Sequence, residues 1–178
     1  MQKKGNVYLV GFMGTGKSSV GQEVAKKKKW QFLDLDELIE LKEKRTIPEI
    51  FAKDGEAYFR KVEKKALEEV ATQKNFVVAC GGGIVLDKDN IKIMKETGTV
   101  ICLTAVPDVI LTRVSGYTHR PLLNVPSPKG QIEHLLKLRA PFYAQADKTI
   151  DTSEYSIIEA ADRILKFISP QKCSSKKQ

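Results

Sequence analysis

Residues 11–18, with the sequence Gly-Phe-Met-Gly-Thr-Gly-Lys-Ser, combine the residue types and spacing that bind nucleotide phosphates. In such a loop the glycines let successive backbone N–H groups converge on a phosphate. Lys17 would contact the β- and γ-phosphates, and the Ser18 hydroxyl would bind Mg²⁺. An apolar run, 7–10, precedes the loop and a helix-compatible segment, 18–28, follows it. This context favours a phosphate site over the alternative, a tight structural turn.

Two carboxylates, Asp34 and Asp36, follow an apolar stretch that begins at Trp30. Residues two apart on a strand point to the same face, and neighbouring carboxylates repel each other unless they share a cation. Phosphate-bound Mg²⁺ would supply this cation for Asp34, and Asp36 could orient a hydroxyl and accept its proton. The alternative is a helix cap, for which Asp36 is the candidate, beside an exposed loop carboxylate. The strand expected at 76–80 ends without an acidic residue, which makes Asp34 the better magnesium candidate.

Three consecutive glycines, Gly81, Gly82 and Gly83, follow the strand expected at 76–80. They would expose backbone N–H groups and leave no side chain in the way of a ligand, although a long loop is the alternative. Arg60 and Glu63 lie three residues apart on a predicted helix, close enough to pair. One interpretation is an ordinary surface ion pair. The other is that Glu63 holds Arg60 in place so that the arginine can bind an anion.

Three further arginines could contact phosphates or substrate. Arg120 lies in the breaker-rich segment 115–128, which is predicted to be a mobile lid that closes over phosphates and excludes water. Arg139 lies four residues before Tyr143 on the following helix, and Arg113, just before the lid, could stack on adenine. Ordinary surface residues remain the alternative for Arg139 and Arg113.

Strands that alternate with helices must position these residues. Strands are expected at 6–10, 30–36, 76–80, 99–103 and 148–151. Helices are expected at 18–28, 37–44, 47–52, 56–72 (after a break at Gly55), 88–96, 107–114, 131–146 and 157–168. This alternation predicts an α/β fold with a parallel sheet and helices on both faces. Because ligands in such folds lie at the carboxyl ends of the strands, the three candidate motifs are expected at one edge.

The length of 178 residues is typical of one domain, which we expect to span residues 1–170 with a disordered basic tail at 171–178. The net charge is +8, but the lysines are scattered and aromatic residues are not interleaved with them. A solvated basic surface is therefore favoured over nucleic-acid binding. No apolar run reaches the ~20 residues of a membrane span. The three cysteines lack zinc or disulfide spacing, which favours the cytoplasm.

Together these motifs resemble the shikimate kinase family. The resemblance covers the P-loop at 11–18, Asp-Leu-Asp at 34–36, Gly-Glu-Ala-Tyr-Phe-Arg at 55–60 with Glu63, the triple glycine, Arg-Pro-Leu-Leu at 120–123 and Leu-Arg-Ala-Pro-Phe-Tyr at 138–143. The motifs follow in order from residue 6 to about residue 153, and the ordered set is far more specific than any one of them.

The resemblance implies a three-layer α/β/α sandwich whose five-stranded parallel sheet has the P-loop topology of nucleoside monophosphate kinases. It also implies ATP- and Mg²⁺-dependent phosphorylation of the 3-hydroxyl of shikimate, on the route to chorismate and aromatic amino acids. Shikimate would be the small-molecule substrate of a monomer that has neither nucleic-acid nor membrane partners.

By motif match, the resemblance also assigns roles to individual residues. Shikimate would contact the residues Asp36, Arg60, Glu63, Gly81, Gly82, Gly83 and Arg139, with Arg60 and Arg139 on its carboxylate. The ATP phosphates would contact Gly14, Thr15, Gly16, Lys17, Ser18 and Ser19, with Arg113 and Arg120 as further nucleotide contacts. Ser18 would hold Mg²⁺, which Asp34 reaches through water. Lys17, the lid arginine Arg120 and the base Asp36 would form the catalytic group.

One position departs from the family pattern. After residues 151–153 some members carry an arginine near adenine, whereas this chain continues with Glu154 and Tyr155. Arg113 is therefore expected to carry more of the nucleotide contact.

Other functions are also compatible with a P-loop. A gluconate or other small-polyol kinase is the nearest alternative. A nucleoside monophosphate kinase is disfavoured by the short lid and by the missing acidic strand end before residue 81. A nucleotide-binding switch or RNA-binding module would instead show no turnover of small polyols and a steep salt dependence of nucleic-acid binding.

Overall fold

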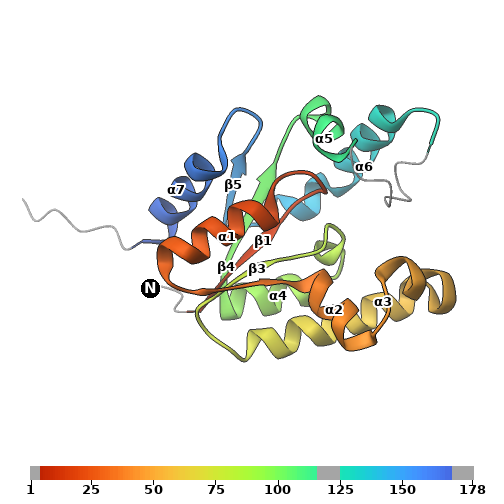
Figure 1. Cartoon of the computed structure of the whole chain (residues 1–178), viewed down its shortest axis with the longest axis horizontal. Coiled ribbons are helices and arrows are strands. Elements are labelled where there is room, and N and C mark those ends of the chain that lie inside the picture. The colour runs from red at the N-terminus through yellow and green to blue at the C-terminus, as the bar shows by residue number, and fades with distance from the viewer. Residues whose placement is uncertain (1–4, 116–124, 170–178) are drawn as a thin grey trace, which may run out of the picture.

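The computed structural model describes residues 5–115 and 125–169, in which a parallel sheet forms the centre of the molecule (Figure 1). The strands are β1 (Asn6–Val10), β2 (Gln31–Asp34), β3 (Phe76–Ala79), β4 (Gly98–Thr104) and β5 (Lys148–Asp151). They lie side by side in the order β2-β3-β1-β4-β5, and every pairing is parallel. The predicted α/β fold with a five-stranded parallel sheet is confirmed.

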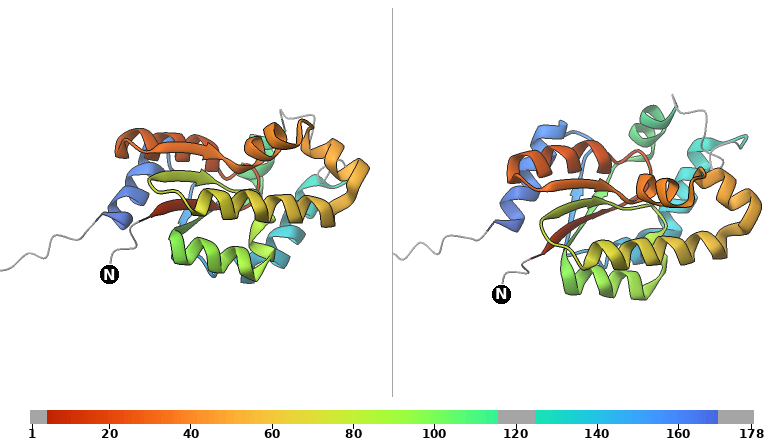
Figure 2. Two further views of the ribbon diagram at one scale, coloured as in Figure 1. Left: turned by 90° about the horizontal axis from the view of Figure 1, so that it is seen from below. Right: turned by 60° about the horizontal axis from the view of Figure 1, so that its bottom comes forward.

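Eight helical segments accompany the strands in the described residues. They are α1 (Lys17–Lys28), α2 (Leu35–Glu43), α3 (Ile47–Ala71), the 3₁₀ turn η1 (Ile84–Leu86), α4 (Lys88–Thr97), α5 (Pro107–Val114), α6 (Pro128–Tyr143) and α7 (Ile157–Ile168) within the described residues. Helices α1 and α7 lie on one face of the sheet, and α3 and α4 lie on the other (Figures 1 and 2). The molecule is therefore a three-layer α/β/α sandwich.

The alternation of side chains along β1 explains why both faces are covered. Val7 and Leu9 pack into the apolar cluster beneath α1 and α7. Tyr8 and Val10 point the other way, into the cluster beneath α2, α3 and α4. Since every residue of β1 is buried, this central strand holds the two layers together.

The start of α2 differs from the prediction. We expected a strand over 30–36 with Asp36 as a candidate cap, but β2 ends at Asp34 and Asp36 lies in the first turn of α2. Asp34 is the cap, because its Oδ1 accepts hydrogen bonds from the backbone N–H groups of Asp36 (3.0 Å) and Glu37 (3.5 Å). A short carboxylate in the extended conformation satisfies the first N–H groups of a helix, so the helix begins one residue after it. The two carboxylates therefore do not share one face of a strand.

Other boundaries shift by a few residues. Gly55 interrupts α3 with φ 80° and ψ 176°, which agrees with the predicted break, but the helical segments on either side adjoin it directly. Helix α6 covers 128–143 instead of the expected 131–146, because Pro128 is at its first turn, where a proline is favourable. The turn η1 was not predicted.

Residues 116–124 of the segment expected to form a lid, with Arg120, and the tail expected at 171–178 lie outside the described residues. None of the described helices combines the length and apolarity that crossing a bilayer requires. Cys80 and Cys102 are buried free thiols, and burial raises the pKa of each.

Candidate active site

The loop between β1 and α1 is shaped to receive an anion. Gly14 (φ 73°) and Gly16 (φ 93°) have the left-handed backbone conformation that glycine adopts without strain. Gly16 caps α1 without a side-chain hydrogen bond, so the first N–H groups of this helix are directed at the loop. Lys17 Nζ donates to the carbonyl oxygens of Gly11 (3.0 Å) and Phe12 (2.8 Å). The loop therefore brings a cation and a helix N-terminus together, as a phosphate site requires.

Ser18 and Asp34, the predicted magnesium pair, are in direct contact. The Ser18 hydroxyl donates to Asp34 Oδ2 at 2.8 Å, while Asp34 Oδ1 caps α2. Mg²⁺ prefers hydroxyl, carboxylate and phosphate oxygens and takes few of its ligands from the protein. The donor set thus suits Mg²⁺ bound mainly by nucleotide phosphates, and the described residues contain no cluster of three or more His, Cys, Asp or Glu side chains that would form a protein cage.

The triple glycine after β3 makes room for charged side chains. A Cβ atom on Gly81 would lie 2.9 Å from Asp36 Oδ1 and 3.0 Å from Glu63 Oε1. A Cβ on Gly83 would lie 2.8 Å from Arg60 Nη1, and one on Gly82 would lie 3.5 Å from an Arg139 guanidinium nitrogen. Each glycine thus lets a different charged group approach the backbone. We call this arrangement, made of residues 81–83 with Asp36, Arg60, Glu63 and Arg139, the acceptor pocket.

Arg60 and Glu63 form the most buried ion pair of the acceptor pocket. Arg60 Nη1 donates to Glu63 Oε2 at 2.7 Å, and two further Arg60 nitrogens donate to Glu56 Oε1 at 3.1 and 3.2 Å. The Glu63 side chain is only 1% exposed, and within the described residues its Oε1 has no hydrogen-bond donor. Burial raises the pKa of Glu63 to about 7, although Arg60 acts in the opposite direction. The buried carboxylate therefore fixes the guanidinium of Arg60 beside Gly83, which is more than a surface ion pair does.

Helix α6 closes the other side of the acceptor pocket. The Tyr143 hydroxyl donates to the carbonyl oxygen of Gly82 at 2.8 Å, and Arg139 Nη1 donates to the same oxygen at 3.4 Å. The Arg139 guanidinium lies 5.6 Å from the ring centroid of Phe12, which belongs to the P-loop. Since a Cβ on Gly82 would also lie 3.4 Å from the Gly11 carbonyl oxygen, the acceptor pocket directly adjoins the phosphate loop.

Arg113 lies on the opposite side of the phosphate loop. It donates to the carbonyl oxygen of Gly14 at 3.2 Å, and to the hydroxyl and carbonyl oxygens of Thr152 at 3.0 and 2.8 Å. The Thr152 hydroxyl in turn lies 2.9 Å from the carbonyl oxygen of Thr15. We call this group, made of the P-loop with Arg113 and Thr152, the nucleotide side.

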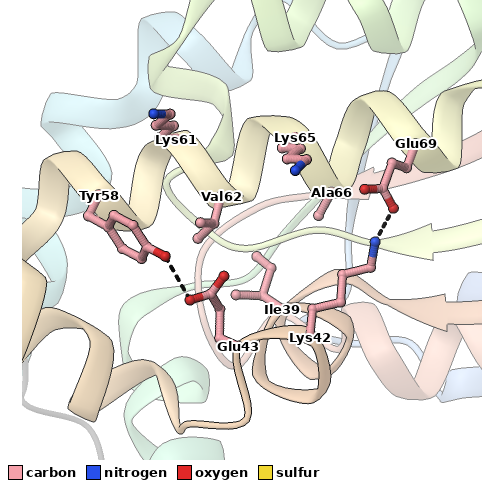
Figure 3. Close-up of a pocket in the computed structure, with 9 residues that line it drawn as sticks. All are labelled: Ile39, Lys42, Glu43, Tyr58, Lys61, Val62, Lys65, Ala66 and Glu69. Atoms are coloured by element: carbon pink, nitrogen blue, oxygen red, sulfur yellow. Dashed lines mark hydrogen bonds and ion pairs between the residues drawn. The ribbon is translucent and has the colours of Figure 1, made fainter.

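A pocket of about 400 Å³ lies elsewhere, between α2 and α3 (Figure 3). The Tyr58 hydroxyl donates to Glu43 Oε2 at 2.9 Å, and Lys42 pairs with Glu69 across the same groove. None of the residues that line it belongs to the acceptor pocket or the nucleotide side. This pocket is therefore separate from both groups of candidate residues.

Comparisons with known proteins identify the family. The sequence model of the family described as "Shikimate kinase" matches residues 13–169. This chain belongs to the shikimate kinase family. A shikimate kinase of Thermoanaerobacter pseudethanolicus is 46% identical over 161 residues, which are 90% of this chain and 94% of that protein. One of Thermodesulfovibrio yellowstonii is 45% identical over 161 residues, or 90% and 93% of the two chains.

Solved structures agree with the family assignment. A shikimate kinase from Acinetobacter baumannii in complex with shikimate superposes with a TM-score of 0.88 at 39% identity, and the match covers 94% of each chain. A gluconokinase from Sinorhizobium meliloti has a TM-score of 0.59 at 16% identity, covering 94% of this chain and 93% of that one, which shows only a shared fold. The comparison therefore favours the shikimate kinase family over the gluconate kinase alternative.

The geometry brings together most of the residues predicted from the shikimate kinase resemblance. Asp36, Arg60, Glu63 and Arg139 meet around the triple glycine, and Ser18 meets Asp34. Ser19 is exposed in the first turn of α1, and Arg120 lies outside the described residues.

Sequence reasoning missed Thr152 as a site residue. Its signals are its position directly after β5, at the carboxyl edge of the sheet, and its place in the segment 151–153, after which some family members carry an arginine near adenine. Tyr143 was noted for its spacing from Arg139, but its bond to Gly82 was not foreseen. Burial raises the pKa of Tyr143 to about 12.

Proposed function

We propose that this member of the shikimate kinase family transfers the γ-phosphoryl group of ATP to the 3-hydroxyl of shikimate in a Mg²⁺-dependent reaction. The product, shikimate 3-phosphate, is used in chorismate and aromatic amino-acid biosynthesis. The observation that supports the proposal most strongly is the convergence of two arginines and a carboxylate on the triple glycine, directly beside a P-loop. A small hydroxy acid requires this combination, because its carboxylate needs cations and its reacting hydroxyl needs an acceptor for its proton.

We assign the acceptor contacts to the acceptor pocket. Arg60 and Arg139 bind the shikimate carboxylate from two different helices, and the Gly82 backbone lies between them. Charge-assisted bonds of this kind contribute roughly 1.5–3 kcal/mol each. Asp36 orients the 3-hydroxyl and accepts its proton during transfer. Glu63 holds the Arg60 guanidinium in place, since its Oε2 accepts the 2.7 Å bond from Nη1.

We assign the nucleotide contacts to the loop residues from Gly14 to Ser19. Lys17 exchanges its bonds to loop carbonyl oxygens for bonds to the β- and γ-phosphates, which are stronger acceptors. Ser18 holds Mg²⁺ and Asp34 contacts it through water. When bound, the ion would supply positive charge that offsets the negative charge developing on the phosphate groups during transfer. Arg113 contacts the base, and Arg120 closes over the phosphates from the lid at 115–128.

The chain is further proposed to work as a single P-loop kinase domain over about residues 1–170, with a basic tail at 171–178. One continuous five-stranded sheet supports a single domain. We propose that it acts as a cytoplasmic monomer without nucleic-acid or membrane partners. The scatter of the lysines over the sequence favours a solvated basic surface over a nucleic-acid interface.

Release of ADP with shikimate, gluconate and AMP, measured in parallel, tests the function. We expect Mg²⁺-dependent release with shikimate only. Release with gluconate alone would contradict the proposal. Absence of release with every acceptor would instead favour a nucleotide-binding module.

A further inference from the structure

Thr152 is a buried polar residue that joins three separate parts of the molecule. It follows β5 directly and is 2% exposed. Its backbone N–H donates to the Thr104 carbonyl oxygen at 2.8 Å, and its hydroxyl lies 2.9 Å from the Thr15 carbonyl oxygen and 3.1 Å from that of Thr104. The end of β4, the end of β5 and the phosphate loop thus meet at a single hydroxyl.

The same residue holds the side chain of Arg113 at two points. Arg113 Nη1 donates to the Thr152 hydroxyl at 3.0 Å and Nη2 donates to the Thr152 carbonyl oxygen at 2.8 Å. Since a guanidinium is planar, two bonds from its terminal nitrogens fix both its position and its plane. A third bond at 3.2 Å, from Nη1 to the Gly14 carbonyl oxygen, fixes this plane relative to the phosphate loop.

The chemistry of these acceptors leaves the charge of Arg113 available. All three are neutral hydroxyl or carbonyl oxygens, so they orient the guanidinium without offsetting its positive charge. Bonds made in the plane of the guanidinium use its edge and not the two faces with which an arginine stacks. The group is therefore held as a flat cation beside the loop that binds the phosphates.

We propose that Thr152 is a positioning residue for the nucleotide, which fixes the guanidinium of Arg113 for contact with the base. This inference rests on the proposed function, because it places ATP on the P-loop. Thr152 determines the affinity for the nucleoside end of ATP, whereas the affinity for the phosphates depends on the loop itself. We expect the loop to keep its shape without the Thr152 hydroxyl, because Thr15 Oγ1 donates to the Phe12 carbonyl oxygen at 2.8 Å and Lys17 Nζ donates to the Gly11 carbonyl oxygen at 3.0 Å.

The test compares ATP with Mg²⁺-tripolyphosphate, which lacks the nucleoside, by calorimetric titration without shikimate. Thr152→Val keeps the shape of the side chain and removes the hydroxyl that Arg113 uses. We expect it to weaken ATP binding about tenfold and to change tripolyphosphate binding less than about twofold. Thr152→Ser keeps the hydroxyl and should restore ATP affinity. Thr149→Val, an exposed threonine of β5, is the matched control and should leave both affinities unchanged.

A double-variant cycle shows whether Thr152 acts through Arg113. In an Arg113→Met background, Thr152→Val should cause no further loss of ATP affinity. A full additional tenfold loss, or an equal loss of ATP and tripolyphosphate affinity, would overturn the positioning role. Unchanged ATP affinity in Thr152→Val alone would also overturn it. If this variant does not fold, Thr152→Cys, whose thiol is a weaker hydrogen-bonding group, carries the same test with a smaller expected loss.

These outcomes are distinct from a failure of the proposed function. Failure of the unaltered protein to bind ATP would contradict the function itself. Normal ATP binding by both the unaltered protein and Thr152→Val would contradict only the role of Thr152.

Discussion

The acceptor pocket and the nucleotide side hold their functional groups by different means. In the acceptor pocket, the charged side chains of Arg60 and Glu63 hold each other at 2.7 Å, Arg139 bonds the Gly82 carbonyl oxygen at 3.4 Å, and glycines give these side chains room. On the nucleotide side, neutral carbonyl and hydroxyl oxygens hold the cationic side chains of Lys17 and Arg113. Recognition of the acceptor should therefore respond to changes of charge and pH, and recognition of the nucleotide to changes of hydrogen-bond geometry.

The largest expected effect is on the pH dependence of stability through Glu63. The pKa of Glu63 in the folded protein is about 7, above its ordinary value of 4.5, so the folded state binds the proton more tightly than the unfolded chain. This contribution to stability is present below pH 4.5 and is lost as the pH rises through about 7. Glu63→Gln keeps an acceptor for Arg60 but does not titrate. As the pH rises from 4.5 to about 7, we expect its free energy of unfolding to increase by about 3 kcal/mol relative to that of the unaltered protein.

Chemical denaturation across this pH range measures the difference. Glu56→Gln is the control, because Glu56 bonds the same guanidinium but its side chain is 63% exposed. The free energy of unfolding of Glu56→Gln should change with pH in the same way as that of the unaltered protein. If the free energy of unfolding of Glu63→Gln also changes with pH in parallel with that of the unaltered protein, the buried carboxylate does not have the raised pKa on which this prediction rests.

The second largest effect is a loss of shikimate recognition with little change in ATP recognition. Arg139→Ala should lower kcat/KM for shikimate by roughly thirtyfold, because one charge-assisted bond of about 2 kcal/mol to the acceptor carboxylate is lost. The KM for ATP should change little, although Arg139 lies 5.6 Å from the Phe12 ring of the loop. Arg113→Ala should have the opposite effect, raising the KM for ATP and changing the KM for shikimate little. Equal effects of Arg139→Ala on both KM values in steady-state kinetics would mean that the acceptor assignment is wrong.

The smallest effect concerns the room that the glycines provide. Gly83 has φ −98°, which alanine adopts without strain, but a Cβ there would lie 2.8 Å from Arg60 Nη1. Gly83→Ala should displace this flexible side chain, raise the KM for shikimate about fivefold and leave stability within about 0.5 kcal/mol. Gly130→Ala, at the first turn of α6 and outside the residues of the acceptor pocket, is the control for shikimate kinetics. Normal shikimate kinetics in Gly83→Ala would show that the Arg60 guanidinium does not need the space that a glycine leaves at this position.

Local sequence signals predicted much of the fold. The bounds of β1, α5, β5 and α7 agree with the sequence to the residue, because clear signals mark several of these ends. Pro107 opens α5, and Ser156 with Glu159 forms a capping box at the start of α7. By contrast, Asp34 and Asp36 lie on either side of the first residue of α2, and spacing alone did not reveal that Asp34 would cap the helix.

The candidate site was predictable where a motif is contiguous and hidden where distant residues meet. The P-loop and the triple glycine are visible as sequence patterns. Thr152 and Thr15 are 137 residues apart, so no local spacing could reveal their contact. The burial of Glu63 is equally hidden, since the sequence shows only its distance of three residues from Arg60.

A crystal structure with shikimate and a non-hydrolysable ATP analogue tests the central claim most directly. The claim is that the acceptor pocket and the P-loop face each other across one reacting hydroxyl. We predict that the shikimate carboxylate lies between Arg60 and Arg139, with the 3-hydroxyl on Asp36 and directed at the γ-phosphate. Shikimate bound away from these three side chains while the analogue occupies the P-loop would contradict the account.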